Sequence, residues 1–220
     1  MNIAASTFDF LKSLQENNNR EWFNAHKEDY EKAKDNVELF IQTLINKLSA
    51  FDPNIDESIQ AKKCLFRIYR DVRFSKDKSP YKTWFAAGIS VDGRKLDGPE
   101  YYIHIGPSNS FVAVGYWRPK KEHLESIRQE IDYNLEAFEQ ALSAGNWTVA
   151  DLSQEDRLVR PPAGYSEDND AIDYLKLKSF IIFKPLEDRD LLKAFALEDI
   201  VQIFQRTLPF KNFIHEAIDI

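Results

Sequence analysis

The chain of 220 residues has a single cysteine, Cys64, only seven glycines and no long uninterrupted run of apolar residues. One cysteine excludes an internal disulfide and suits a reducing compartment. The few dispersed glycines form no glycine-rich phosphate-binding motif. No stretch approaches the roughly 18 apolar residues that span a bilayer, and the first residues lack the basic and apolar regions of a signal peptide. We therefore expect a cytoplasmic protein without a membrane partner.

Motifs of the familiar catalytic and metal-binding classes are missing as well. The four histidines, at positions 26, 104, 123 and 215, are scattered and show no metal-ligand spacing such as HExxH. No Gly-x-Ser-x-Gly segment marks a nucleophilic serine. We therefore expect no metal site and no cofactor, and the sequence by itself leaves open whether the protein is an enzyme.

The composition is that of a soluble globular protein, with 43% hydrophobic and 30% charged residues. A chain of this length buries roughly 70% of its unfolded surface, which is enough for a core without disulfides or metals. We find no repeat and no linker, and expect residues 1–220 to form a single α+β domain. The net charge of -7 argues against binding duplex DNA with the whole surface, although a local basic groove for nucleic acid stays open.

Hydrophobic periodicity predicts where the helices lie. Apolar residues recur at helical spacing from about residue 20 to residue 50, and again from 124 to 142 with a break near Asn134. The tail from 188 to 220 is also expected to be helical, with an interruption at Pro209. Residues 145–172 are polar and carry prolines, and we expect them to form a long loop.

Short segments with strand character lie between these helices, and their connections are too short for helical crossovers. Asp92-Gly93 predicts a tight turn after the first of them. The segments occupy residues 85–91, 100–105, 111–117 and 180–183. The predicted fold class is therefore α+β, with an antiparallel meander sheet packed by a long N-terminal helix and C-terminal helices.

The stretch from Cys64 to Phe85, CLFRIYRDVRFSKDKSPYKTWF, departs from the charge balance of the rest. Phe66 and Ile68 alternate with polar residues, which predicts a strand with one apolar face. After Val72 the alternation ends, and Ser79-Pro80 breaks the chain because proline fixes φ and removes a backbone donor. Against two acidic residues, the stretch holds six basic ones: Arg67, Arg70, Arg73, Lys76, Lys78 and Lys82.

These six basic side chains are the candidate ligand-binding residues. A guanidinium group matches the geometry of carboxylate or phosphate, and a lysine adds a mobile point charge. Each charge-assisted hydrogen bond contributes roughly 1.5–3 kcal/mol where water is excluded. The partner predicted on this basis is an anionic small molecule.

Two alternatives stay open for the same cluster. In the first, the protein is an enzyme acting on a phosphorylated or acidic substrate, with Asp71 or His104 supplying acid-base chemistry. In the second, the cluster is a salt-bridged scaffold or a homodimer contact, neutralised by the chain's own 36 acidic residues. The scaffold alternative predicts that every arginine of the stretch is paired with an acidic residue.

Four segments of the chain carry a family resemblance. They are Arg67-x-x-Arg70-Asp71-x-Arg73-Phe74-Ser75-x-Asp77-Lys78-Ser79-Pro80-Tyr81-Lys82, Asn18-Asn19-Arg20-Glu21-Trp22-Phe23, Gly115-Tyr116-Trp117 before Pro119, and Pro162-x-Gly164-Tyr165 followed by Leu177-Lys178-Ser179-Phe180. Together they resemble domain-of-unknown-function family 2461, a set of conserved hypothetical proteins. The resemblance spans nearly the whole chain. It implies one domain, with the central string as its hallmark, and it implies no particular activity.

Overall fold

The computed structural model describes residues 1–91, 93 and 97–218. The chain divides into two compact units, each assembled from separate stretches of sequence. Unit 1 comprises residues 1–94, 102–112 and 185–201, and unit 2 comprises residues 95–101, 113–184 and 202–220. The prediction that residues 1–220 form one domain stays a prediction. Among the described residues, no helix is both long enough and apolar enough to cross a membrane.

An antiparallel sheet forms the centre of the fold, with its four strands in sequence order. They are β1 (Phe85–Ile89), β2 (Glu100–Ile105), β3 (Phe111–Tyr116) and β4 (Phe180–Pro185). The predicted α+β class with a meander sheet is therefore confirmed. Of the predicted Asp92-Gly93 turn, Asp92 lies outside the described residues, and Gly93 has a φ of 71°.

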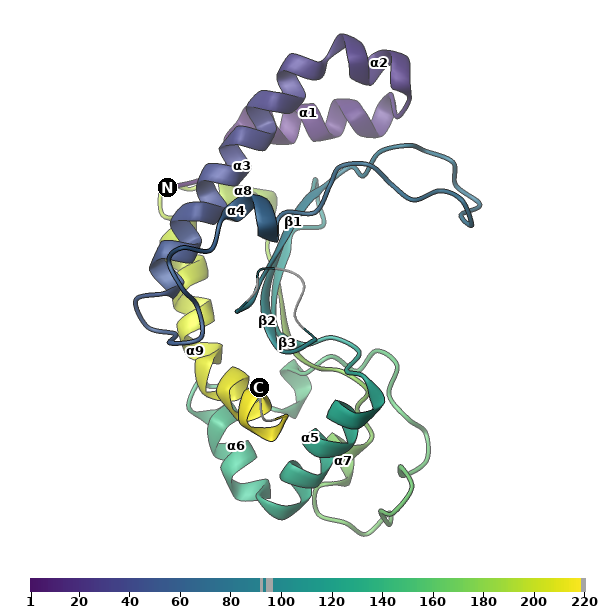
Figure 1. Cartoon of the computed structure of the whole chain (residues 1–220), viewed down its shortest axis with the longest axis vertical. Helices are drawn as coiled ribbons and strands as arrows, with labels where there is room; N and C mark the ends of the chain where they lie inside the picture. The colour runs from purple at the N-terminus through teal and green to yellow at the C-terminus, as the bar shows by residue number, and fades with distance from the viewer. Residues whose placement is uncertain (92, 94–96, 219–220) are drawn as a thin grey trace. The chain divides into compact units, whose positions relative to one another are not determined.

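Unit 1 contains the N-terminal helices, and Figure 1 shows α1 alongside α3. A main-chain hydrogen bond of 2.9 Å from Ile3 to Leu191 joins the start of the chain to α8. Helix α3 also packs against α4 and β1. The helices of this unit are α1 (Ala5–Glu16), α2 (Arg20–Ala25), α3 (Lys27–Leu48), α4 (Ala61–Cys64) and α8 (Asp188–Leu192).

The long N-terminal helix was predicted as one element and is two. Helix α2 ends and α3 begins at His26, whose φ of -111° and ψ of 26° are not helical. The imidazole Nδ1 lies 2.9 Å from the carbonyl oxygen of Trp22, and the two rings stack at 4.1 Å. This side chain thus satisfies a carbonyl group at the helix end. No glycine or proline marks the break, which is why periodicity alone missed it.

The predicted strand after Cys64 is not a regular strand. The chain from Leu65 to Trp84 instead leaves the sheet and returns as two irregular arms, visible in Figure 1 between α4 and β1. Two isolated antiparallel bridges mark it, one from Leu65 to Ala87 and one from Tyr69 to Tyr81. We call residues 65–84 the basic ribbon.

Unit 2 holds most of the remaining helices and its own core. The break predicted near Asn134 is present, because α5 ends at Tyr133 and α6 begins at Leu135. Residues 145–171 are irregular apart from one short 3-10 helix, as expected. The elements are α5 (Lys121–Tyr133), α6 (Leu135–Ser143), η2 (Val149–Asp151) and α7 (Ile172–Leu175), with α9 (Ala196–Ala217) starting in unit 1.

Helix α9 contradicts the expected interruption at Pro209. The helix runs continuously through the proline. An interior proline costs about 3 kcal/mol because it removes one main-chain hydrogen bond and crowds the preceding turn. Burial offsets that cost here, since Phe204, Phe210 and Ile214 are all fully buried on the same helix.

Strands β3 and β4 approach each other closely at Gly115. This glycine has a φ of 127°, a conformation that residues with a side chain rarely adopt. A Cβ atom at this position would collide with the carbonyl oxygen of Phe180. The Gly115 segment and the Phe180 segment are two of the four that carry the family resemblance, so these two meet in the structure.

Candidate functional site at the basic ribbon

The two arms of the basic ribbon are held together by their backbones. Arg70 donates its N–H to the carbonyl of Pro80 at 2.9 Å, and Lys82 donates to the carbonyl of Ile68 at 2.7 Å. Ile68 is buried, whereas Arg67 and Tyr69 are exposed, as the alternation predicts. The ribbon therefore has an apolar face toward its unit and a basic face toward solvent.

The turn between α1 and α2 anchors the returning arm. The side-chain amide of Asn18 donates to the carbonyl of Tyr81 at 3.0 Å and accepts from the N–H of Tyr81 at 3.1 Å. Asn18 thus pairs with Tyr81 as a neighbouring strand would. The Tyr81 ring is buried and stacks on Phe23 at 4.0 Å with the planes 13° apart. Two further segments of the family resemblance therefore meet here.

Both aspartates of the ribbon pair with arginines. Asp77 pairs with Arg70, and Asp71 receives hydrogen bonds from Arg73 Nε at 3.0 Å and Nη2 at 2.6 Å. Hydrogen bonds from Ser79, together with the pair to Arg70, lower the pKa of Asp77 to about 2. The bonds from Arg73 likewise lower the pKa of Asp71. Both carboxylates are therefore ionised at neutral pH.

The lysines of the ribbon mostly contact its own main chain. Lys78 Nζ donates to the carbonyl of Val72 at 2.9 Å. Lys82 Nζ donates to the carbonyl of Arg67 at 2.8 Å and lies 4.8 Å from the ring centre of Trp84. Lys76 is exposed. The side chains of Arg67 and Lys76 form no hydrogen bond or ion pair with any described residue.

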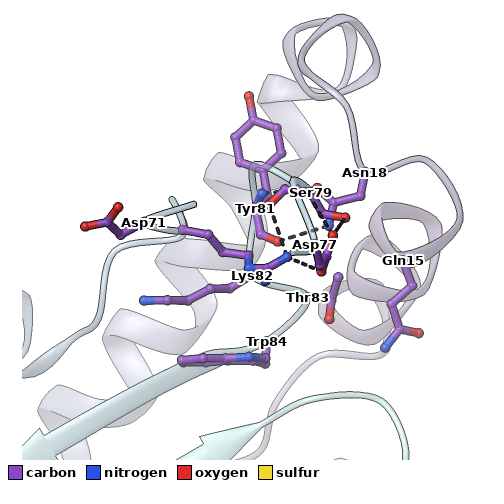
Figure 2. Close-up of a pocket in the computed structure, with 10 residues that line it drawn as sticks. Gln15, Asn18, Asp71, Asp77, Ser79, Tyr81, Lys82, Thr83 and Trp84 are labelled. Carbon is purple, nitrogen blue, oxygen red and sulfur yellow. Dashed lines mark hydrogen bonds and ion pairs between the residues drawn. The ribbon is translucent and has the colours of Figure 1, made fainter. Parts of the chain in front are cut away.

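An open hollow of about 610 Å³ lies between the ribbon and the α1–α2 turn. Figure 2 shows Lys82 extending over the flat of the Trp84 ring, with Asp77, Ser79 and Asn18 close together. Asp71 points away from the other labelled side chains. The residues that line the hollow are Gln15, Asn18, Arg70, Asp71, Asp77, Ser79, Tyr81, Lys82, Thr83 and Trp84.

The hollow takes in only part of the predicted site. Arg70 and Lys82 line it from opposite arms, and the other four predicted residues are not among its lining. The predicted site residues did not include the uncharged lining: Gln15, Asn18, Ser79, Tyr81, Thr83 and Trp84. Asn18 carried a signal, because it begins one of the segments of the family resemblance. Gln15 carried no such signal, because it lies in a helix outside those segments and its position at the hollow depends on how α1 packs.

His104 lies behind the hollow rather than in it. Its ring packs between Trp84, at 4.7 Å, and Phe111, at 4.8 Å. Burial lowers the pKa of this imidazole to about 4, so it is neutral at pH 7. The residue is not part of the hollow's lining.

Comparison with known families decides where the chain belongs. A family described as conserved hypothetical protein (DUF2461) matches residues 6–213. The chain belongs to the DUF2461 family. Neither a curated protein nor a solved structure matches the chain.

Membership in DUF2461 confirms the resemblance seen in the four segments. In this DUF2461 protein, those segments form hydrogen bonds with one another in pairs. The Asn18 and Tyr81 segments bond to each other in unit 1. In unit 2, the N–H of Arg118, which follows Gly115-Tyr116-Trp117, donates to Ser179 Oγ at 2.9 Å. The family description names no activity, so the roles of these residues rest on their geometry and charge.

Proposed function

We propose that the hollow at the basic ribbon binds a small anionic ligand carrying a phosphate or carboxylate group. One observation supports this most strongly: Arg70 and Lys82, on opposite arms, line one hollow. Both belong to a stretch of sequence that contains six basic residues and only two acidic ones. The protein carries a net charge of -7, so the ribbon is a local reversal of sign.

Arg70 is oriented for such a role. Its Nη1 group bonds to Asp77 and, at 3.2 Å, to the carbonyl of Ser79. Within the described residues, no hydrogen bond uses its Nε or Nη2 group. Asp77 holds the guanidinium plane in place, and the remaining donors are left for a bidentate anion. Pre-orientation of this kind lowers the entropy cost of binding.

The uncharged residues of the lining suit the uncharged part of a ligand. Trp84 offers a flat aromatic surface next to Lys82. Gln15, Asn18 and Thr83 offer neutral polar groups around the opening. Arg67, Arg73, Lys76 and Lys78 lie on the same ribbon and raise the local concentration of anions without contacting the ligand.

The alternative interpretations draw less support from the geometry. Asp71 lines the hollow, but its hydrogen bonds to Arg73 lower its pKa and keep it ionised. Neutral His104 packs against Trp84 and does not line the hollow, so neither residue suits acid-base chemistry there. The scaffold interpretation requires every arginine of the ribbon to be paired. Arg67 forms no ion pair with any described residue, whereas Arg70 and Arg73 do.

The proposal is tested by measuring anion binding at low ionic strength, where screening is weakest. The probes are inorganic phosphate, pyrophosphate, citrate and a short single-stranded oligonucleotide. Their binding is measured by calorimetry and by thermal shift. We expect Arg70→Gln and Lys82→Met each to weaken binding of the best probe about tenfold, the loss of one charge-assisted hydrogen bond. Lys82→Met keeps the apolar stem on Trp84 while removing the charge.

Lys32→Met is the matched control, since it removes an exposed lysine of α3 that pairs with Glu28. It should bind the probes as the wild type does. If none of the anions binds, or if all three variants weaken binding equally, the proposed site is wrong. Preference for the oligonucleotide over the small anions would make nucleic acid the partner instead.

A further inference from the structure

Arg128 in α5 is a buried cation of unit 2 that the ribbon site does not use. Its side chain is only 8% exposed. The Nη2 group donates to the carbonyl of Leu177 at 2.9 Å, and the Nε group is buried without a hydrogen-bond partner among the described residues. No described carboxylate forms an ion pair with it. Burial lowers the pKa of this guanidinium, which nevertheless stays protonated in any protein.

Burying a cation without a directly paired anion costs free energy, although carboxylates lie near Arg128. Glu125 and Asp132 lie on the same helix and line the same hollow. Asp132 instead accepts a hydrogen bond from the Asn169 amide at 2.6 Å. No described carboxylate therefore forms a direct ion pair with Arg128, and Glu125, which pairs with Lys121, acts on it only through space. Desolvation of this charge has already occurred in folding, and an anion that reached it would gain its full attraction.

A hollow of about 650 Å³ opens onto Arg128. Half of its twelve lining residues are apolar or aromatic, and its walls combine α5 with the Pro162-x-Gly164-Tyr165 segment of the family resemblance. Leu177, whose carbonyl holds Arg128, belongs to the segment that follows. The apolar and aromatic lining residues are Leu124, Tyr133, Leu158, Pro162, Ala163 and Tyr165.

We propose that this hollow is a second binding site, for a small monocarboxylic acid with an apolar or aromatic body, whose carboxylate pairs with Arg128. The planar guanidinium matches a carboxylate, and the apolar walls match the rest of such a molecule. Glu125 at the same opening is paired with Lys121, and Asp132 adds a negative charge that repels a doubly charged phosphate more strongly than a single carboxylate. The site lies in unit 2 and does not depend on the ribbon in unit 1.

Three probes that each contain a phenyl ring but differ in charge test this proposal. Phenylacetate carries the carboxylate, phenylacetamide is its neutral counterpart, and phenethylamine carries a cation that Glu125 and Asp132 would attract. Binding to the full chain is followed by calorimetry and by amide chemical shifts of α5 and residues 158–165. We expect phenylacetate to bind at least tenfold more tightly than either of the other probes.

Arg128→Met tests the assigned residue while retaining most of its volume. It should weaken phenylacetate binding at least tenfold and bring it to the level of the amide. Arg160→Met removes an exposed arginine of the same unit outside the hollow and should leave binding unchanged. If Arg128→Met fails to fold, the comparison of acid with amide on the wild-type protein still decides.

Four results would overturn the proposal. One is equal binding of phenylacetate and phenylacetamide, another is preferred binding of phenethylamine, and the third is a folded Arg128→Met protein that binds phenylacetate as well as the wild type does. An absence of binding by phenylacetate would also count against it. None of these results affects the ribbon proposal, because Arg70→Gln and Lys82→Met are tested with different probes in the other unit.

Discussion

Burial sets the chemistry of single side chains in this protein, and His104 is the clearest case. Its Nε2 group is buried and has no hydrogen-bond partner among the described residues. The ring is 7% exposed and lies between Trp84 and Phe111. Water cannot stabilise the charged imidazolium there, so burial lowers the pKa from 6.5 to about 4. The neutral ring thus acts as part of the aromatic wall behind the hollow.

His104 makes stability depend on acid pH. The unfolded state binds its proton below about pH 6.5, whereas the folded state binds it only near pH 4. The stabilising effect is therefore complete above pH 6.5 and is lost as the pH falls toward 4. Between pH 7 and pH 4.5, we expect the free energy of unfolding of the wild type to fall by on the order of 2–3 kcal/mol more than that of His104→Phe, whose aromatic ring cannot titrate.

Urea unfolding at pH 7, 5.5 and 4.5 measures the effect. Burial raises the pKa of Glu100 to about 7, which lowers stability as the pH rises from 4.5 to 7, opposite to His104. Glu100 is present in both proteins, so the difference between them reports His104. Parallel pH profiles for the wild type and His104→Phe would show that this imidazole does not control the acid-side loss.

At the scale of single residues, the sequence identifies the stretch where basic side chains gather, but not which of them line a hollow. Composition alone singles out the six basic residues, because charge is a property of each residue by itself. Which of them face the hollow depends on the twist of the two arms, which places Arg70 and Lys82 inward and leaves Arg67 and Lys76 exposed. Burial of His104 was likewise decided by rings brought from other elements.

Among the elements, the basic ribbon depends most on a neighbour. It has no regular strand of its own among the described residues, and only a few main-chain hydrogen bonds join its arms. A two-stranded ribbon is marginally stable in water without further packing. The turn between α1 and α2 supplies Asn18 and helix α2 supplies Phe23, both of which contact Tyr81.

We therefore expect Asn18→Ala to loosen the ribbon. The change leaves the N–H and carbonyl of Tyr81 without partners, which costs about 1–3 kcal/mol of stability. It should also speed amide hydrogen exchange of residues 68–82 more than that of α3. Both are measured by urea unfolding and by hydrogen exchange.

Asn17→Ala is the matched control, because within the described residues the side-chain amide of Asn17 bonds only to the carbonyl of Ser13 in α1, at 3.0 Å. It should cost no more than about 0.5–1 kcal/mol and leave ribbon exchange unchanged. Equal effects of the two substitutions would mean that Asn18 does not anchor the ribbon.

Elements with strong periodicity were predictable, and elements shaped by contacts were not. The apolar stripe of α3 and the strands β1 to β4 follow from spacing along the chain. The helix break at His26 depends on a ring stacked on Trp22, and continuity through Pro209 depends on burial of one helix face. Trp22 and His26 are only four residues apart, but such a pair is equally compatible with an unbroken helix. The burial of α9 depends on residues from other elements.

For the whole molecule, the sequence predicts one domain, and the structure divides into two compact units. Four of the five boundaries between the units fall inside β2, β3, β4 and α9. Because a strand or helix shared by both units loses hydrogen bonds throughout when either half melts, we propose that the chain unfolds as one cooperative domain.

This proposal predicts one urea transition with the same midpoint in both units. Amide signals of α3 report unit 1 and those of α5 report unit 2, and thermal unfolding by calorimetry gives a second test, since the calorimetric and van't Hoff enthalpies should agree. Two separate midpoints, or a calorimetric enthalpy well above the van't Hoff value, would identify two independent domains.

The sequence by itself determined the class of fold, the order of strands, the family and the stretch where positive charge gathers. These follow from the period of apolar residues, the lengths of connections and the count of charges, all of which are local along the chain. Tertiary structure alone decided that Asn18 anchors the ribbon, that only Arg70 and Lys82 of the six line its hollow, and that Arg128 is buried beside a second one. Each of these depends on contacts between residues far apart in sequence, because burial and convergence are properties of packed elements and not of any segment.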